Sequence, residues 1–145
     1  MADTDSSRLL AIVEREAGRL RSLPAAETAR RPAAGKWCRR EILGHLLDSA
    51  LNNHQRFVRA QLADSLDIGG YAQDDWVRVQ GYAETDWGAL VTLWEGMNRR
   101  LAEVMARIPA ASLPTPIRIG GKPAVTLEFV VADYLRHVEH HLGQI

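Results

Sequence analysis

Cysteine and long apolar runs are scarce in this sequence. Cys38 is the single cysteine among 145 residues, which excludes an intramolecular disulfide and a metal site built from Cys-x-x-Cys pairs. No apolar run approaches the roughly 20 residues that a membrane-spanning helix needs. The start of the chain is polar and acidic, unlike a signal peptide. These absences predict a cytoplasmic protein that acts on no membrane.

Neither sign of charge is in excess. The chain has 18 basic and 18 acidic side chains, and its formal net charge is zero. Binding to nucleic acid depends on a basic face that neutralises phosphates. The arginine doublets at 30–31, 39–40 and 99–100 are scattered and have acidic neighbours. We therefore expect a small-molecule substrate and no nucleic-acid partner.

The length predicts one domain, residues 1–145. Apolar residues recur at steps of three and four in four stretches, which predicts four helices. These helices are expected over 5–23, 37–63, 86–108 and 126–145. Pro24 and Pro109 end the first and the third helix, and Asp86 can cap the start of the third. The predicted fold is therefore all-α, a four-helix bundle.

Two of the connections between these helices are long, at 64–85 and 109–125. The segment DDWVRV at 74–79 can form a short helical turn in the first connection. The glycine pair at 120–121 predicts a small hairpin in the second. Long crossover connections allow a helix order other than simple up-and-down.

The five histidines are the most informative residues. His137 and His141 are four residues apart on a predicted helix, so their rings point the same way and can bind one metal ion together. His137 and His140 could do so nearly as well. A third ligand would come from another helix, and His45 is the best candidate. Three neutral imidazoles leave an open coordination position, which is typical of a catalytic metal.

The alternative interpretation is that these histidines bind no metal. A single histidine on an apolar helix face is more often a core or surface residue than a ligand. His45 alone would be interpreted in that way, but together with the cluster at 137–141 it favours a metal site. His54 lies half a turn off the His45 face and is expected to point away. The HExxH motif of zincins and the Glu-x-x-His pair of di-iron bundles are absent from the sequence.

Two carboxylates are placed where they could orient the histidines. Asp48 lies one turn after His45, and Asp133 lies one turn before His137. Ligand histidines usually donate their second ring N–H to such a group. The alternative is that both aspartates make ordinary polar pairs within their own helices.

A polar stripe continues along the second predicted helix on the side of its first histidine. Asp48, Asn52 and Arg56 form this stripe. Arg56 is a candidate clamp for a carboxylate or phosphate of a substrate. The alternative is a solvated helix face. In the crossover that follows, Tyr71 and Trp76 could line the mouth of a pocket, although most such aromatic residues anchor a core or a loop.

Three segments together resemble the DinB-like superfamily. They are GHLLDSALNNHQRF (44–57), GYAQDDWV (70–77) and DYLRHVEHHLGQI (133–145). Their order also fits: a tryptophan before the histidine helix, a His-x-x-Asp-Ser motif, a Tyr-x-x-x-x-Trp segment and a terminal His-x-x-His-His. Within the superfamily, the sequence is similar to the branch that contains the bacillithiol S-transferases.

The resemblance implies an antiparallel four-helix bundle of up-down-down-up topology, often a homodimer. It also implies a divalent metal, zinc or nickel among others, held by His45, His137 and His141. This ligand set decides between His141 and His140, and it leaves His140 as a supporting residue beside the ligands.

The resemblance also bears on activity. Members of known chemistry include thiol S-transferases and a mycothiol-dependent isomerase, in which the metal is thought to activate the thiol of a low-molecular-weight cofactor. We therefore expect a metal-dependent enzyme similar to a thiol S-transferase, whose thiol arrives with the substrate because the chain has one cysteine. A metal-dependent hydrolase is the main alternative, since the same open site can activate water. Another alternative is a non-enzymatic binding or stress-response bundle that holds a metal only structurally, or holds none.

Overall fold

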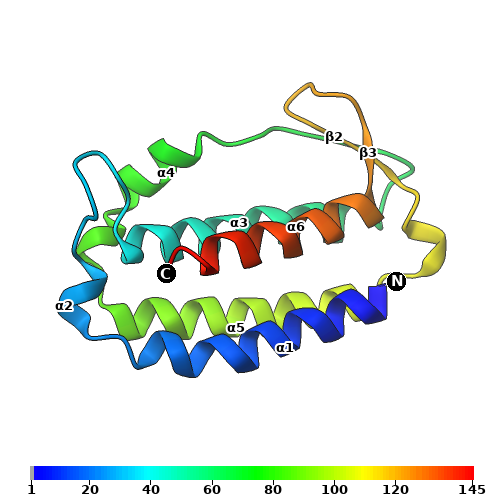
Figure 1. The fold of residues 1–145 in the computed structure, drawn as a ribbon. Coiled ribbons are helices and arrows are strands. Elements are labelled where there is room, and N and C mark those ends of the chain that lie inside the picture. Colours follow the sequence, from blue (N-terminus) through cyan, green and yellow to red (C-terminus); the bar gives the residue numbers. More distant parts are fainter. Residues whose placement is uncertain (1) are drawn as a thin grey trace.

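The computed structural model describes residues 2–145, with side chains from Thr4 onward. Four long helices form its body (Figure 1). They are α1 (Ala2–Arg21), α3 (Arg39–Ala60), α5 (Trp87–Ala106) and α6 (Leu127–Leu142). Helices α3 and α5 run in one direction, and α1 and α6 run in the other (Figure 1). The predicted four-helix bundle and its up-down-down-up order are therefore confirmed.

The ends of the long helices are set by capping groups. Asp86 caps α5 as predicted, because its side chain accepts a hydrogen bond from Ala89 N at 2.9 Å. Thr126 caps α6 by accepting from Phe129 N at 3.1 Å. Cys38 precedes α3, and its backbone N–H donates to the Glu41 carboxylate at 3.1 Å. The helices begin and end within three residues of the predicted positions.

The connections carry more structure than the sequence predicted. Short helical segments interrupt them: α2 (Ala25–Thr28), α4 (Gln73–Gln80), η1 (Tyr82–Glu84) and η2 (Ala110–Ser112). Three short strands pair in the order β1-β2-β3: β1 (Leu66–Ile68), β2 (Pro116–Ile119) and β3 (Val125–Thr126). The predicted hairpin is the antiparallel β2–β3 pair, with Gly120 and Gly121 at positive φ angles of 59° and 75°.

Strand β1 is an addition to the predicted helical bundle that the sequence did not predict. It pairs parallel to β2, with Leu66 opposite Ile117. A three-residue strand whose partner lies 51 positions away (117 − 66) leaves no periodic signal in the sequence. The two long connections therefore meet in a small sheet above the paired helices α3 and α6 (Figure 1).

Large aromatic side chains fill the middle of the bundle. Trp94, Tyr134 and Phe57 are fully buried there. The rings of Phe57 and Tyr134 meet edge to face with centroids 5.9 Å apart, a geometry worth about 0.5–1.5 kcal/mol beyond simple burial. The Tyr134 hydroxyl donates to the buried Asn98 side chain, which joins α6 to α5. No helix in the described chain is both long and apolar enough to cross a membrane.

Residues 41–50 of α3 are all buried. The bundle covers one side of this stretch, and the crossover with α4 and η1 covers the other. Tyr82 of η1 packs directly on Gly44, where an added Cβ would lie only 2.1 Å from the tyrosine ring. The Tyr82 hydroxyl also donates to the buried Asp48 carboxylate at 2.6 Å. Glycine at position 44 therefore lets the crossover dock on the helix.

Gly44→Ala should push the Tyr82 ring off α3. We expect the free energy of unfolding to fall by about 1–3 kcal/mol, as in other overpacked cores. The measurement is urea denaturation of the metal-free chain. The control is Gly96→Ala in α5, where a Cβ meets nothing within 4 Å. That change should be neutral or stabilise the helix by up to about 1 kcal/mol, and equal destabilisation of both variants would contradict the docking role.

Candidate metal centre

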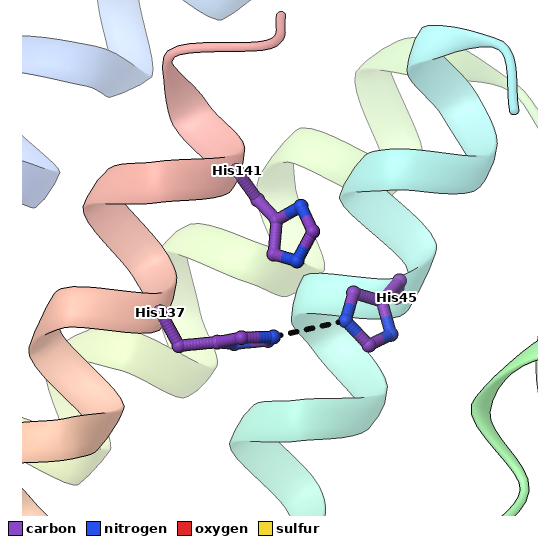
Figure 2. Close-up of side chains that lie close together, drawn as sticks. All are labelled: His45, His137 and His141. Atoms are coloured by element: carbon purple, nitrogen blue, oxygen red, sulfur yellow. Dashed lines mark hydrogen bonds between the residues drawn. The ribbon is translucent and has the colours of Figure 1, made fainter.

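Three histidines converge between α3 and α6 (Figure 2). His45 comes from the second turn of α3, and His137 and His141 come from successive turns of α6. One ring nitrogen from each lies within 4.8 Å of the others. The Nε2 atoms of His45 and His137 are 3.0 Å apart. Two nitrogens that share a tetrahedral metal at about 2.1 Å are separated by roughly 3.4 Å, and the His45–His137 spacing is close to this value. The geometry therefore suits a shared cation.

The environment keeps two of these rings uncharged. His45 is only 1% exposed. Burial, followed by the neighbouring histidines, lowers the pKa of His45 to about 4. Burial likewise lowers the pKa of His137 to about 4. Both imidazoles are therefore neutral near pH 7, which is the protonation state that binds a metal.

Neighbouring side chains orient two of the rings. His141 Nδ1 lies 2.7 Å from the Gln144 side-chain oxygen. An N–H donated there leaves His141 Nε2 free as an acceptor or ligand. Ser49 Oγ lies 3.3 Å from Nδ1 of His137. Neither Gln144 nor Ser49 was predicted as a site residue. Their spacings, three residues after His141 and four after His45, were the signals that could have identified them.

His45 is held differently. The Trp37 ring packs against its imidazole with centroids 5.0 Å apart. Its Nδ1 atom is buried and has no hydrogen-bond partner among the described residues. The ring is therefore fixed by packing and by its two histidine neighbours rather than by a carboxylate. Trp37 is the tryptophan that precedes the histidine helix in the sequence motif.

The two candidate orienting carboxylates make other contacts. Asp48 accepts from Tyr82 at 2.6 Å and from Gln80 Nε2 at 2.9 Å, and it makes no hydrogen bond to a described histidine. Burial raises the pKa of Asp48. Asp133 pairs with Arg136 on the helix surface at 3.1 Å. Asp133 therefore makes an ordinary polar pair within its own helix, which was the alternative interpretation. Asp48 instead joins α3 to the crossover.

The remaining candidates are spread around the cluster. Asn52 donates to the backbone oxygen of Asp48 at 2.9 Å, which ties it to its own helix. The His140 ring packs beside His141 with centroids 4.9 Å apart. His54 is outside the group of converging nitrogens. Arg56 lines a cavity next to His137.

Cavities flank the histidines on two sides. The larger, about 620 Å³, reaches His141 and Gln144 and is walled by Trp37, Ile42 and the 32–36 loop. The smaller, about 160 Å³, reaches His137 and is closed by the sheet. Tyr71 lines the smaller cavity. Trp76 packs on Tyr71 with centroids 5.0 Å apart but lines neither cavity.

Comparison with known proteins finds a matching family and several relatives whose names state metal dependence. The model of the DinB superfamily matches residues 13–145. A protein of Oceanobacillus iheyensis, "Putative metal-dependent hydrolase OB0413", is 28% identical over 126 residues, which cover 86% of this chain and 71% of that protein. A protein of Halalkalibacterium halodurans, "Putative metal-dependent hydrolase BH0277", is 24% identical over a match that covers 86% of this chain and 72% of that protein.

A solved structure has the same fold. YfiT from Bacillus subtilis, described as a probable metal-dependent hydrolase with an unusual four-helix bundle topology, superposes with a TM-score of 0.88. The match covers 99% of this chain and 83% of that one at 19% identity. The similarity extends over all four long helices, so it includes the two helices that carry the histidines.

Loss of a ligand histidine should abolish stoichiometric metal binding. We expect about one divalent ion per chain in protein prepared without a histidine tag, and far less in His45→Ala, His137→Ala and His141→Ala. Gln144→Ala should weaken binding by about 10- to 100-fold, as is usual when the orienting partner of a ligand is removed. Elemental analysis and competition with a chelator measure both effects. His54→Ala is the control, and metal loss in that variant, or retention in His45→Ala, would contradict the ligand set.

The metal-free chain should lose stability in mild acid. Because the folded pKa values of His45 and His137 lie below the unfolded value of about 6.5, the unfolded chain binds more protons as the pH falls towards 4. The contribution of the two neutral histidines to the free energy of unfolding is complete above pH 6.5 and is lost as the pH falls from about 6.5 to 4. Urea unfolding with chelator should show a steeper fall over this range in wild type than in His45→Gln. His54→Gln should keep the wild-type slope, and parallel slopes in wild type and His45→Gln would refute this origin.

Proposed function

The chain belongs to the DinB superfamily, and on that premise we propose that it is a metal-dependent hydrolase whose divalent ion is held by His45, His137 and His141. The observation that carries the proposal is the convergence of three ring nitrogens beside a cavity of about 620 Å³. The names of the curated relatives support the same class of reaction.

The donor set fits a borderline divalent cation. Imidazole nitrogen suits zinc and nickel, and these are the metals we propose. Within the described chain, no fourth histidine, cysteine or carboxylate joins the cluster. Three protein ligands leave room for a further group, as in catalytic rather than closed structural sites. Bound there, the cation would supply Lewis-acid chemistry that lowers the pKa of a water molecule or a thiol.

The protein's own side chains would prepare this chemistry. Gln144 fixes the His141 ring through Nδ1, and Ser49 lies against Nδ1 of His137. Trp37 packs on His45 and also walls the larger cavity. An apolar surface beside the ligands lowers the local dielectric constant and strengthens polar interactions within the site.

A thiol S-transferase is the second candidate. The larger cavity, at about 620 Å³, falls in the size range of sites that hold drug-sized ligands and could accommodate a low-molecular-weight thiol beside His141. Cys38 is fully buried at the start of α3 and cannot serve as the nucleophile. A reacting thiol would therefore have to enter as a cofactor, and the cation would increase its thiolate fraction.

The decisive experiment measures turnover with and without thiol. Protein loaded with zinc or nickel is assayed against a panel of activated esters and amides, and separately against an alkylating electrophile with several low-molecular-weight thiols. We expect thiol-independent hydrolysis that falls at least about 100-fold in His141→Ala, because that variant lacks a metal ligand. His54→Ala, with normal metal content, is the matched control.

The other outcomes are equally specific. Consumption of the electrophile only when thiol is present would favour the transferase. Stoichiometric metal without either activity would overturn the enzyme proposal and leave a non-enzymatic metal-binding bundle. Hydrolysis that is equal in wild type and His141→Ala would show that the reaction does not use this centre.

A further inference from the structure

The smaller cavity has a chemical character that the proposed reaction does not explain. It lies between α3, α6 and the sheet, and it opens on the His137 side of the metal centre. Its polar lining from α3 and the crossover consists of Ser49, Asn53, Arg56 and Tyr71. At about 160 Å³ it has room for one small functional group and the few substrate atoms attached to it.

Arg56 is the cation of this cavity and forms no salt bridge there with a described residue, and Asp133 acts on its charge only from beyond 4.0 Å. Its side chain is half-buried, and burial lowers its pKa, although a guanidinium remains charged in proteins. Its single hydrogen bond within the described chain is a long one, 3.4 Å to the Asn53 side-chain oxygen. No described carboxylate lies within 4.0 Å of it, whereas Arg8 and Arg21 each reach a glutamate within 3.0 Å.

The other charge in the cavity wall is already compensated. Asp133 lines the same cavity, but its carboxylate pairs with Arg136 at 3.1 Å. Arg56 therefore retains most of its hydrogen-bonding capacity, with up to five N–H donors in a planar fork. A partly desolvated cation with unused donors favours an anion that can satisfy them.

We propose that this cavity is a carboxylate subsite, in which Arg56 binds a carboxylate of the substrate while the reacting group lies at the three histidines. A single guanidinium matches a monoanion, and the planar fork matches the two oxygens of a carboxylate. The location of the reacting group rests on the proposed function, but carboxylate binding by Arg56 does not.

Binding can be measured without metal or turnover. Sodium acetate is titrated into the chelator-treated, ¹⁵N-labelled chain at constant ionic strength, and the side-chain resonances of Arg56 and the backbone resonances around Tyr71 are followed by NMR. Acetamide is the neutral probe of the same shape, and inorganic phosphate is the dianionic probe. We expect acetate to bind and to shift the Arg56 signals, and acetamide and phosphate to bind more weakly.

Variants locate the site. Arg56→Gln should weaken acetate binding by about 10- to 100-fold, the usual range for a lost charge-assisted hydrogen bond. Arg56→Lys should be intermediate, because it keeps the charge but loses the fork. Arg59→Gln, on the exposed side of the same helix, is the matched control and should bind acetate like wild type. Circular dichroism establishes that each variant is folded.

Each contrary result overturns the assignment. Equal acetate affinity in folded wild type and Arg56→Gln would remove Arg56 as the anchor. If acetamide bound as tightly as acetate, charge would not contribute to binding. If phosphate bound more tightly than acetate, the cavity would be a site for a dianion and not for a carboxylate.

Kinetics then separate this proposal from the hydrolase proposal. Substrates are compared in pairs that carry either a carboxylate or its methyl ester. Arg56→Gln should raise KM about 10- to 100-fold for the carboxylate member only, with kcat little changed. Acetate binding without turnover of any substrate would support the subsite and refute the hydrolase. Turnover without a carboxylate preference, and with an unchanged KM in Arg56→Gln, would refute the subsite and support the hydrolase.

Discussion

The packing of α3 against α6 is the contact on which the site depends. It brings the Nε2 atoms of His45 and His137, 92 positions apart in the chain, to within 3.0 Å. A buried polar atom without a partner destabilises a fold by about 1–3 kcal/mol, so the contact between these two ring nitrogens, or a cation that they share, would offset part of the cost of burying the imidazoles. A cation bound by both rings would join the two helices directly. Metal binding would therefore be thermodynamically coupled to folding in this bundle.

The crossover makes that burial possible. Without α4 and η1, the face of α3 opposite the bundle would lie in water. Tyr82 covers it by packing on Gly44 and by donating to Asp48 at 2.6 Å. The carboxylate of Asp48 is thereby used to hold the crossover, and His45 can be 1% exposed without a carboxylate partner. The same segment that connects the helices thus sets the low-dielectric surroundings that depress the histidine pKa values.

The features that could be predicted from the sequence are those that depend on residue spacing within one segment. The four helices, the Asp86 cap and the β2–β3 hairpin follow from spacing within each segment. Convergence of the three histidines also follows, once two helices are assumed to pack. The pairing of β1 with β2 and the choice of Tyr82 as the partner of Asp48 could not be predicted, because each joins segments more than 30 residues apart. Asp48 was placed on the correct helix, but a residue in the crossover competes for its carboxylate.

The two cavities on either side of the histidines differ in size and polarity. On the His141 side the wall is mainly apolar and the space large, which suits variable or bulky groups. On the His137 side the space is small and contains a guanidinium without a salt bridge to a described residue, which suits one fixed polar group. A substrate anchored at its charged end has few ways to place the rest of its atoms, so its reacting bond would be held beside the histidines. Because Arg56 and His45 stand on the same rigid helix, that alignment would be set by α3 itself and would not require a moving loop.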